Sequence, residues 1–246
     1  MVTISYADHK SRQVLCTDIN VEITDSLTNS FITRNDVVEL IERRMYSPIG
    51  HPLWHINTLQ IEKHLFELHP VRMVSAFKTS DGRLNIQIEQ RKPIMRVINS
   101  RNQSYYIDTE GQILPLSSKF TAHVLIINGN ILEPFQIKPD VKILSWNGKP
   151  NEQPPLICQV FELGRYIAED EFWNSQIAQI YVETPDDIEL IPRVGAHVVK
   201  LGGVDDYETK LQKLKIFYER GLTAVGWNQY SEVNLKFKNQ IICTKR

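Results

Sequence analysis

The sequence of 246 residues contains no long run of apolar residues. No stretch approaches the roughly 18–20 consecutive apolar residues that a transmembrane helix needs. The opening residues, MVTISYADHKSR, also lack the apolar segment of a secretory signal peptide. The sequence therefore predicts neither a membrane span nor a signal peptide.

Cysteine is scarce, and the three cysteines Cys16, Cys158 and Cys243 lie far apart. None belongs to a CxxC pair, which excludes a zinc knuckle and a thioredoxin-type motif. An odd number argues against a complete disulfide framework, although one bridge stays open. We expect all three to be buried small hydrophobic residues.

The charge balance shows no surplus of either sign, because 28 Lys and Arg face 29 Asp and Glu. A nucleic-acid-binding surface normally carries a basic surplus, so this class of function is not indicated. Hydrophobic residues make up 42% of the chain, which is enough for a sizeable core. The length suits one large domain or, more naturally, two of ordinary size.

Catalytic motifs are also missing. The sequence has no GxSxG, GxxxxGK[ST], HExxH or GxGxxG. His51 and His55 have a His-x3-His spacing, but Pro52 disfavours a helical metal pair and no third ligand is near. Asp186 and Asp187 follow a proline between two expected strands, which predicts a turn rather than a catalytic dyad. We expect no enzymatic activity, cofactor or metal.

The first third of the chain alternates strand and helix signals. Thr33 and Asp36 have capping-box spacing before an apolar stripe, and Asn57 and Gln60 repeat that spacing. Asp81-Gly82 is a strong turn signal between two alternating strands. The expected order is strand 14–23, helix 33–45, helix 57–69, strand 71–79 and strand 83–91. This β-α-α-β-β order predicts a sheet with two helices on one face.

The remainder is mostly β, so the predicted fold class is α+β with a largely antiparallel second domain and flanking helices. Glu110-Gly111 is expected to turn a hairpin, and Gly221 to end the clearest helix. The proline-rich residues 130–155 are expected to form a loop. The expected elements are hairpin 104–116, strand 123–129, helix 155–173, strands 176–183, 187–193 and 197–202, and helix 205–221.

The chain closes with "VNLKFKNQIICTKR", which predicts a hairpin. Val233, Leu235 and Phe237 alternate with polar residues, as in a half-buried strand. A second strand follows at residues 241–245. Its alternation leaves two possibilities for the inward side chains, which are Ile241 with Cys243 or Ile242 with Thr244. A terminal strand tends to leave one edge of its sheet unpaired.

Four segments, taken in order, resemble the FtsQ/DivIB family of bacterial cell-division proteins. The β-α-α-β-β order is similar to that of a POTRA domain, and Asn234 stands where the family's strand signature has an acid. The closing residues resemble the Bacteroidota branch of the family. The matching segments are "QRKPIMRV" (90–97), "YYIDTEG" (105–111), "VVKLGGVDDYETKLQKLKIFY" (198–218) and "SEVNLKF" (231–237).

The resemblance implies a POTRA domain at residues 14–95 and an FtsQ-type β domain at 96–246. FtsQ-type proteins carry a single N-terminal membrane helix, which this sequence lacks. Residues 1–13 would then be the remnant of a membrane-proximal linker. The implied location is the periplasm, as part of a single-pass inner-membrane protein at the division septum.

The implied function is a non-catalytic scaffold of the divisome that binds FtsB- and FtsL-type proteins through the open terminal edge. Other division proteins are expected to contact the POTRA domain. An alternative is a POTRA-bearing chaperone for outer-membrane or secreted proteins. A wall-modifying enzyme lacks support, because no nucleophile or metal site is indicated. The expected partner-binding residues are Tyr230, Lys236, Phe237, Gln240, Ile241, Ile242, Cys243, Thr244 and Lys245.

Overall fold

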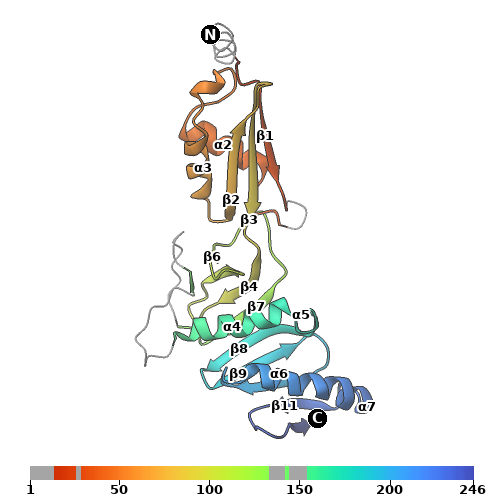
Figure 1. The fold of residues 1–246 in the computed structure, drawn as a ribbon. Coiled ribbons are helices and arrows are strands. Elements are labelled where there is room, and N and C mark those ends of the chain that lie inside the picture. The colour runs from red at the N-terminus through yellow and green to blue at the C-terminus, as the bar shows by residue number, and fades with distance from the viewer. Residues whose placement is uncertain (1–13, 26–28, 133–141, 144–153) are drawn as a thin grey trace. The chain divides into compact units, whose positions relative to one another are not determined.

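The computed structural model describes residues 14–25, 29–132, 142–143 and 154–246. The chain divides into two compact units (Figure 1), the first ending at Lys92 but also including Ser117–Ala122. The expected linker at 1–13 and most of the expected loop at 130–155 lie outside the described residues. Within the described part, no helix is long and apolar enough to cross a bilayer.

The first unit confirms the expected β-α-α-β-β order. Its sheet has the strand order β1-β3-β2, in which β1 and β3 are parallel and β2 and β3 antiparallel. The elements are β1 (Asp18–Ile23), α2 (Arg34–Arg44), the short 3-10 helix η1 (Leu53–His55), α3 (Thr58–Phe66), β2 (Val71–Lys78) and β3 (Arg83–Gln90).

Local side-chain chemistry starts and ends these elements where the sequence predicted. Thr33 and Asp36 form a reciprocal capping box at the start of α2. The Asn57 side chain accepts a hydrogen bond from the Gln60 N–H at the start of α3. Gly82 turns the chain between β2 and β3 with a φ of +91°, a conformation that glycine adopts at low cost.

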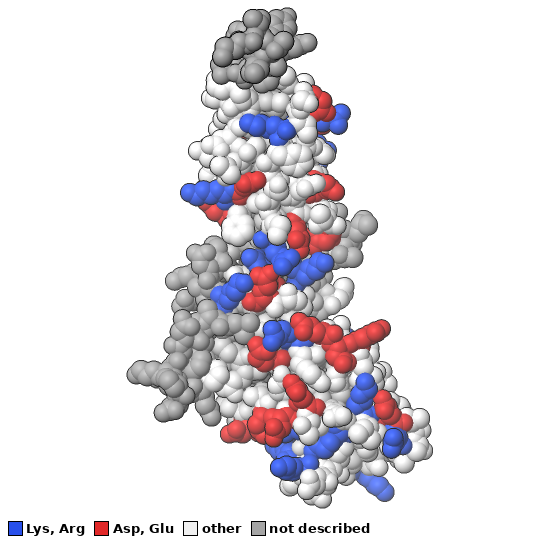
Figure 2. Space-filling view, viewed as in Figure 1, with Lys and Arg blue, Asp and Glu red and all other residues white. Residues whose placement is uncertain are grey.

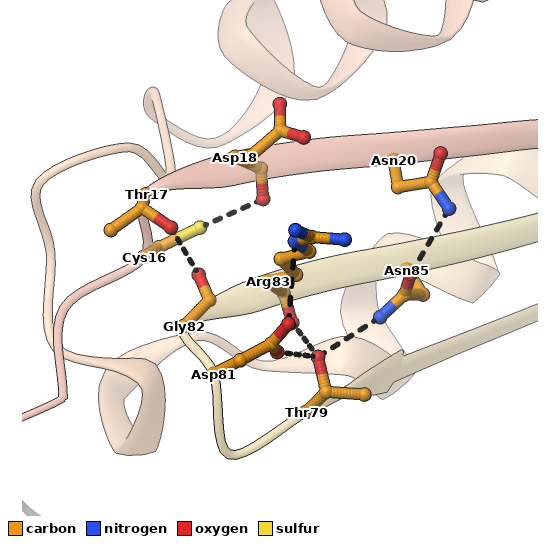
Figure 3. A network of polar contacts seen from close by, with 9 residues as sticks. All are labelled: Cys16, Thr17, Asp18, Asn20, Thr79, Asp81, Gly82, Arg83 and Asn85. Atoms are coloured by element: carbon orange, nitrogen blue, oxygen red, sulfur yellow. Dashed lines mark hydrogen bonds and ion pairs between the residues drawn. The ribbon is translucent and has the colours of Figure 1, made fainter.

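The two faces of this sheet differ in polarity. One face buries alternate residues of β3 against both helices, and the other carries polar ladders between strands. Figure 3 shows the Asn20 amide donating to Asn85 across β1 and β3 at 3.1 Å. The result is a two-layer unit with one core. The fully buried core residues include Val37, Ile41, Ile61, Leu65, Leu84, Ile86 and Ile88.

Residues 117–122 come from the sequence of the second unit but cluster with the first. The Phe120 ring meets Phe31 edge-on, with 5.0 Å between ring centroids. The Lys119 ammonium forms an ion pair with Asp36 at the N-terminus of α2. Nothing in the local sequence of 117–122 predicted this assignment.

The second unit is built on one nine-stranded sheet with the order β12-β11-β10-β9-β8-β7-β4-β5-β6. Five of the neighbouring pairs are antiparallel, and β10–β11, β7–β8 and β4–β7 are parallel. The elements are β4 (Pro93–Ile98), β5 (Ser104–Asp108), β6 (Ile113–Leu114), β7 (Leu125–Gly129), α4 (Leu156–Glu169), α5 (Glu171–Gln176), β8 (Ile177–Thr184), β9 (Asp187–Pro192), β10 (Val198–Gly202), α6 (Tyr207–Ile216), the π-helical segment η3 (Phe217–Leu222), α7 (Thr223–Val225), β11 (Tyr230–Asn234) and β12 (Ile242–Lys245).

One face of this sheet is apolar and is covered by helices, and α4 and α6 lie in front of the strands in Figure 1. Alternate strand residues fill the core, whereas the other face carries polar pairs such as Lys200 with Glu189. The expected domain boundary after residue 95 falls inside β4, which spans Pro93–Ile98. Met95 is fully buried in the core of the second unit. Core strand residues include Ile127, Ile180, Val182, Ile188, Leu190, Val199, Leu201 and Val233.

Two expected helix ends were wrong. The expected helix 155–173 is broken at Asp170, whose side chain accepts from the Trp173 N–H and caps the separate helix α5. Gly221 does not end the last helix, which continues through the π-helical segment to Val225. The chain leaves the helix at Gly226, where φ is +97°. Gly221, which follows the apolar stripe, therefore does not end the helix. The glycine with the positive φ that helix ends favour is Gly226.

The first strand of the closing hairpin was placed too late. The structure forms β11 over Tyr230–Asn234, and Phe237 is 45% exposed rather than inward. The cause is local: the Asn234 carbonyl Oδ1 accepts the Lys236 N–H at 3.0 Å and turns the chain out of the sheet. Val233 and Leu235 are fully buried, as the alternation predicted.

Candidate partner-binding edge

Strand β12 is the last strand of the nine-stranded sheet and pairs only with β11 among the described residues. The register joins Ile242 to Asn234, Cys243 to Val233 and Thr244 to Glu232. One side of β12 therefore carries backbone N–H and C=O groups without a strand partner. Such an edge can accept an added strand or must be guarded against one.

The direction of each backbone group in β12 follows from the neighbouring ladders. Leu235 donates its N–H to the carbonyl of Lys200 in β10 at 2.9 Å. The backbone groups of Val233 in β11 and of Leu235 just after it therefore face β10, and those of Glu232 and Asn234 face β12. Ile242 and Thr244, which pair with Asn234 and Glu232, therefore direct their N–H groups toward β11. These N–H groups are not available to an added strand.

The alternate residues of β12 face the open edge. Ile242 and Thr244 are paired with Asn234 and Glu232, so Cys243 and Lys245 point their N–H groups the other way. The alternation continues one residue further, because the N–H of Arg246 again points toward the β11 side and donates to the carbonyl of Gln229 at 3.2 Å. Among the residues that the structure describes, the amides of Cys243 and Lys245 are therefore the donors of β12 that face away from β11.

The side chains of the strand divide between two faces. Ile241 and Cys243 pack against the core of the second unit, whereas Ile242 is 43% exposed and Thr244 is exposed. Of the two arrangements that the sequence left open, the structure has the first. Burial raises the pKa of the Cys243 thiol, which keeps it neutral. Of the three cysteines expected to be buried, Cys16 is buried, whereas Cys158 and Cys243 are only partly buried.

The loop between β11 and β12 is held from two sides. The Lys213 ammonium of α6 donates to the carbonyls of Phe237 and Lys238 at 2.9 and 3.1 Å. The Lys236 ammonium lies 2.8 Å from a carboxylate oxygen of Asp187, the first residue of β9. This ammonium lowers the pKa of Asp187. The loop is therefore fixed by two lysines with different partners.

Tyr230 lies at the far end of β11, where the register with β12 shifts opposite Lys245. Its ring packs against Phe217, with 6.2 Å between ring centroids. Gln240 is exposed in the loop immediately before β12. The structure thus brings all nine expected residues into the closing hairpin, but it turns Tyr230 toward the helix and Lys236 toward Asp187.

A groove opens next to the edge, between the last helix and the loop. It has a volume of about 380 Å³, and its apolar residues include Ile216, which is 50% exposed. Lys213 and Arg220 place cations at its wall, and Figure 2 shows Lys and Arg side chains at this end of the second unit. The lining residues are Lys213, Ile216, Phe217, Arg220, Gly221, Asn239, Gln240 and Ile241.

Sequence reasoning missed the helix wall of this groove. The available signal was Ile216, a large apolar residue opposite the buried stripe of a charged helix. The wall includes a π-helical turn, a geometry that occurs often at functional sites. The groove and the edge meet at Ile241, so an added strand and a groove ligand could belong to one partner.

The alternative sites that the sequence suggested have ordinary structural roles. The His51 ring is tilted against Tyr46 and the His55 ring is stacked on it, at 4.9 and 6.0 Å between ring centroids. Asp187 opens β9 after the turn and pairs with Lys236. Within the described residues, no cluster of three or more His, Cys, Asp or Glu side chains could hold a metal ion.

Comparison with known protein families agrees with this architecture. Residues 92–244, more than half of the chain, match the family described as FtsQ/DivIB, C-terminal related. The chain belongs to the FtsQ/DivIB family. Residues 14–89 match a POTRA-like domain, which corresponds to the first unit. No curated protein matches the chain.

Membership of the FtsQ/DivIB family confirms the resemblance found in the sequence and, with the POTRA-like match, the predicted α+β fold class. FtsQ/DivIB proteins are non-enzymatic proteins of cell division. Membership of this family supports a division-related role for the chain. The matched range covers the residues that line the groove and β12 as far as Thr244.

Proposed function

We propose that this FtsQ/DivIB protein is a non-catalytic scaffold of the divisome. It binds an FtsB- or FtsL-type protein as an added strand on β12 and so supports septal cell-wall synthesis. The observation that carries the proposal is the open edge, whose outward N–H groups at Cys243 and Lys245 are ready to pair. The folded units lie in the periplasm, attached to the inner membrane by an N-terminal helix of the kind found in the family.

Strand addition fits the chemistry of this edge. The partner's backbone would accept the N–H groups of Cys243 and Lys245 and supply donors to the carbonyls of β12, which gives affinity. Specificity would come from the exposed side chains of Ile242 and Thr244, which alternate with the buried ones. The strand is short, so backbone bonds alone would give a weak complex.

The groove supplies the additional contact that such a complex needs. A partner strand that leaves β12 at Ile241 would reach the groove directly. An apolar partner side chain would cover Ile216, and an acidic one would meet Arg220. The two contacts together select a partner segment with an extended part, an apolar anchor and a nearby acid.

A proline at Lys245 tests the proposal with little effect on the fold. Lys245→Pro removes an outward N–H that β11 does not use, whereas Lys245→Ala removes only the exposed side chain. A backbone hydrogen bond contributes about 0.5–1.5 kcal/mol, and the proline ring also blocks close approach. We expect Lys245→Pro to weaken binding to the periplasmic part of the FtsB-type partner at least about tenfold.

The control is Thr244→Pro, which removes an N–H directed to β11 and should unfold the end of the sheet. Circular dichroism and thermal unfolding establish which variants keep the fold. Equal affinities for Lys245→Pro, Lys245→Ala and the parent chain would show that the partner binds elsewhere. Capture of outer-membrane proteins instead of division proteins would favour the chaperone alternative.

A further inference from the structure

One end of the first unit exposes a group of aromatic and apolar side chains that we call the tip. It consists of Leu15, Tyr46, Ile49, His51, Trp54 and His55. Trp54 is 63% exposed, Ile49 50% and Leu15 49%. Large apolar side chains are rarely exposed together on a soluble surface without a binding role.

The backbone under the tip is firmly held, so these side chains are not exposed by fraying. The chain at residues 14–16 pairs with the loop at 50–53: Cys16 donates to the carbonyl of His51, and Gly50 to that of Cys16, both at 2.8 Å. The Lys78 ammonium donates to the carbonyls of Leu53 and Ile56 at 2.9 and 3.1 Å. The fold therefore presents Trp54 on a rigid loop.

The rings of the tip form one cluster. The Trp54 ring lies 5.5 Å from that of His55, and Tyr46 contacts both His55 and His51. The Tyr46 hydroxyl donates to the carbonyl of His55 at 3.2 Å. Trp and Tyr rings combine an apolar body with a polar atom, which suits the boundary between lipid headgroups and acyl chains.

The charges around the tip largely cancel. Helix α2 ends with Arg43 and Arg44, and the Arg44 guanidinium lies 3.7 Å from the Glu67 carboxylate. In the adjacent turn between β2 and β3, the Arg83 guanidinium lies 3.3 Å from the Asp81 carboxylate, and Figure 3 shows that turn beside Cys16 and Thr17. No strong surplus of negative charge is therefore evident among these residues to repel phospholipid headgroups, and the attraction comes from the rings and apolar side chains of the tip.

We propose that the tip contacts the surface of a phospholipid bilayer, with Trp54, Ile49 and Leu15 in the headgroup region. The inference rests on the proposed function, in which a membrane helix precedes the first unit. Val14 is the first described residue of the unit and begins the tip-forming segment. A membrane helix on the N-terminal side of the unit would therefore lead into the tip before any other part of the unit.

Quenching of tryptophan fluorescence by brominated lipid tests the proposal. The full chain, carrying an N-terminal hexahistidine tag, is attached to vesicles of phosphatidylethanolamine, phosphatidylglycerol and a nickel-chelating lipid. The vesicles are prepared with and without brominated acyl chains. Both chains carry Trp146→Phe, which removes the fourth tryptophan. We expect the brominated vesicles to quench the emission of the chain that keeps Trp54 and not that of its Trp54→Phe variant, because Trp173 is buried and Trp227 is partly buried.

A second variant separates insertion from mere proximity. Leu15→Ser with Ile49→Ser keeps the reporter Trp54 and the tether but removes the neighbouring apolar groups. The quenching should fall at least twofold. Val194→Ser, which removes an exposed apolar residue from the second unit, is the matched control and should leave it unchanged.

Absence of quenching in the parent chain, or equal quenching in the double variant, overturns the lipid contact. A division defect of folded Trp54→Phe without any quenching would identify the tip as a protein-binding surface instead, which also overturns it. Neither outcome touches the proposed partner edge, because Lys245→Pro measures that edge separately in the absence of lipid.

Discussion

At the scale of single residues, a buried histidine makes the second unit sensitive to acid. His197 is 2% exposed, and its Nε2 lies 2.9 Å from the hydroxyl of Tyr218 on the last helix. The Trp227 ring closes the cluster, 5.0 Å from that of Tyr218. Burial lowers the pKa of His197 below its ordinary value of 6.5 and raises that of Tyr218.

We expect the second unit to lose stability as the pH falls below about 6.5. Above that pH, His197 is neutral in both the folded and the unfolded chain. Below it, the unfolded chain takes up a proton that the folded chain refuses, until the pH reaches the lowered folded pKa. Each pH unit between the two pKa values lowers the free energy of unfolding by up to about 1.4 kcal/mol.

Urea unfolding of a Trp54→Phe chain at pH 7.5 and pH 5.0, followed by tryptophan emission, measures this loss, because the other three tryptophans belong to the second unit. His197→Gln is the matched variant, because it keeps a polar side chain near Tyr218 but cannot titrate. The difference in unfolding free energy between the two pH values should be smaller in the variant. An identical difference would show that other groups carry the pH dependence.

At the scale of elements, the sequence predicted helix starts and turns because those signals are local. The capping box of Thr33 and Asp36 and the turn at Gly82 depend on a few neighbouring residues. The end of the last helix could not be predicted in the same way. Gly221 lies within the π-helical segment, and the chain leaves the helix five residues later.

The closing hairpin shows a second limit of local reasoning. The alternation of Val233, Leu235 and Phe237 is real in the sequence, but only the first two residues are buried. The Asn234 side chain turns the chain before Phe237 can join the sheet. Alternation predicts which side chains would share a face, whereas hydrogen bonding decides where the strand ends.

The junction of β7 and β8 gives a prediction about packing. Gly129 has a φ of +111°, and an added Cβ would lie 2.8 Å from the Val182 nitrogen and closer still to its carbonyl oxygen. Gly226 also has a positive φ, but its nearest neighbour would be the Gln229 side chain at 3.9 Å. Both alanine variants suffer backbone strain, and only Gly129→Ala adds a clash with the neighbouring strand.

We therefore expect Gly226→Ala to cost roughly 1–3 kcal/mol of unfolding free energy. Gly129→Ala should cost at least about 1 kcal/mol more, because its clash is with backbone that cannot rotate away. Urea unfolding of both variants measures the two losses. Similar losses would show that β7 and β8 can move apart to accommodate a methyl group.

At the scale of the whole molecule, the sequence predicted the fold class but not the order of strands. The β-α-α-β-β order fixed the first unit's elements, yet the parallel pairing of β1 with β3 depends on residues 65 positions apart, such as Asp18 and Arg83. The assignment of Ser117–Ala122 to the first unit likewise depends on distant contacts at Phe31 and Asp36.

The partner-binding edge was predictable in part. A terminal strand in a β domain suggested an open edge, and the structure has β12 at the end of the sheet. The orientation of its backbone groups required the pairing of β10, β11 and β12, which no local pattern contains. The groove needed the fold as well, because its walls come from α6, the π-helical segment and the closing loop.

The central claim is that a partner strand completes the edge of β12. Residue-resolved amide hydrogen exchange, measured by NMR on the full chain with and without the FtsB-type partner, tests it most directly. In the free chain, the account predicts protected amides at Ile242 and Thr244 and fast exchange at Cys243 and Lys245. Addition of the partner should protect Cys243 and Lys245. Fast exchange at both residues in the saturated complex, or protection of both already in the free chain, would contradict the account.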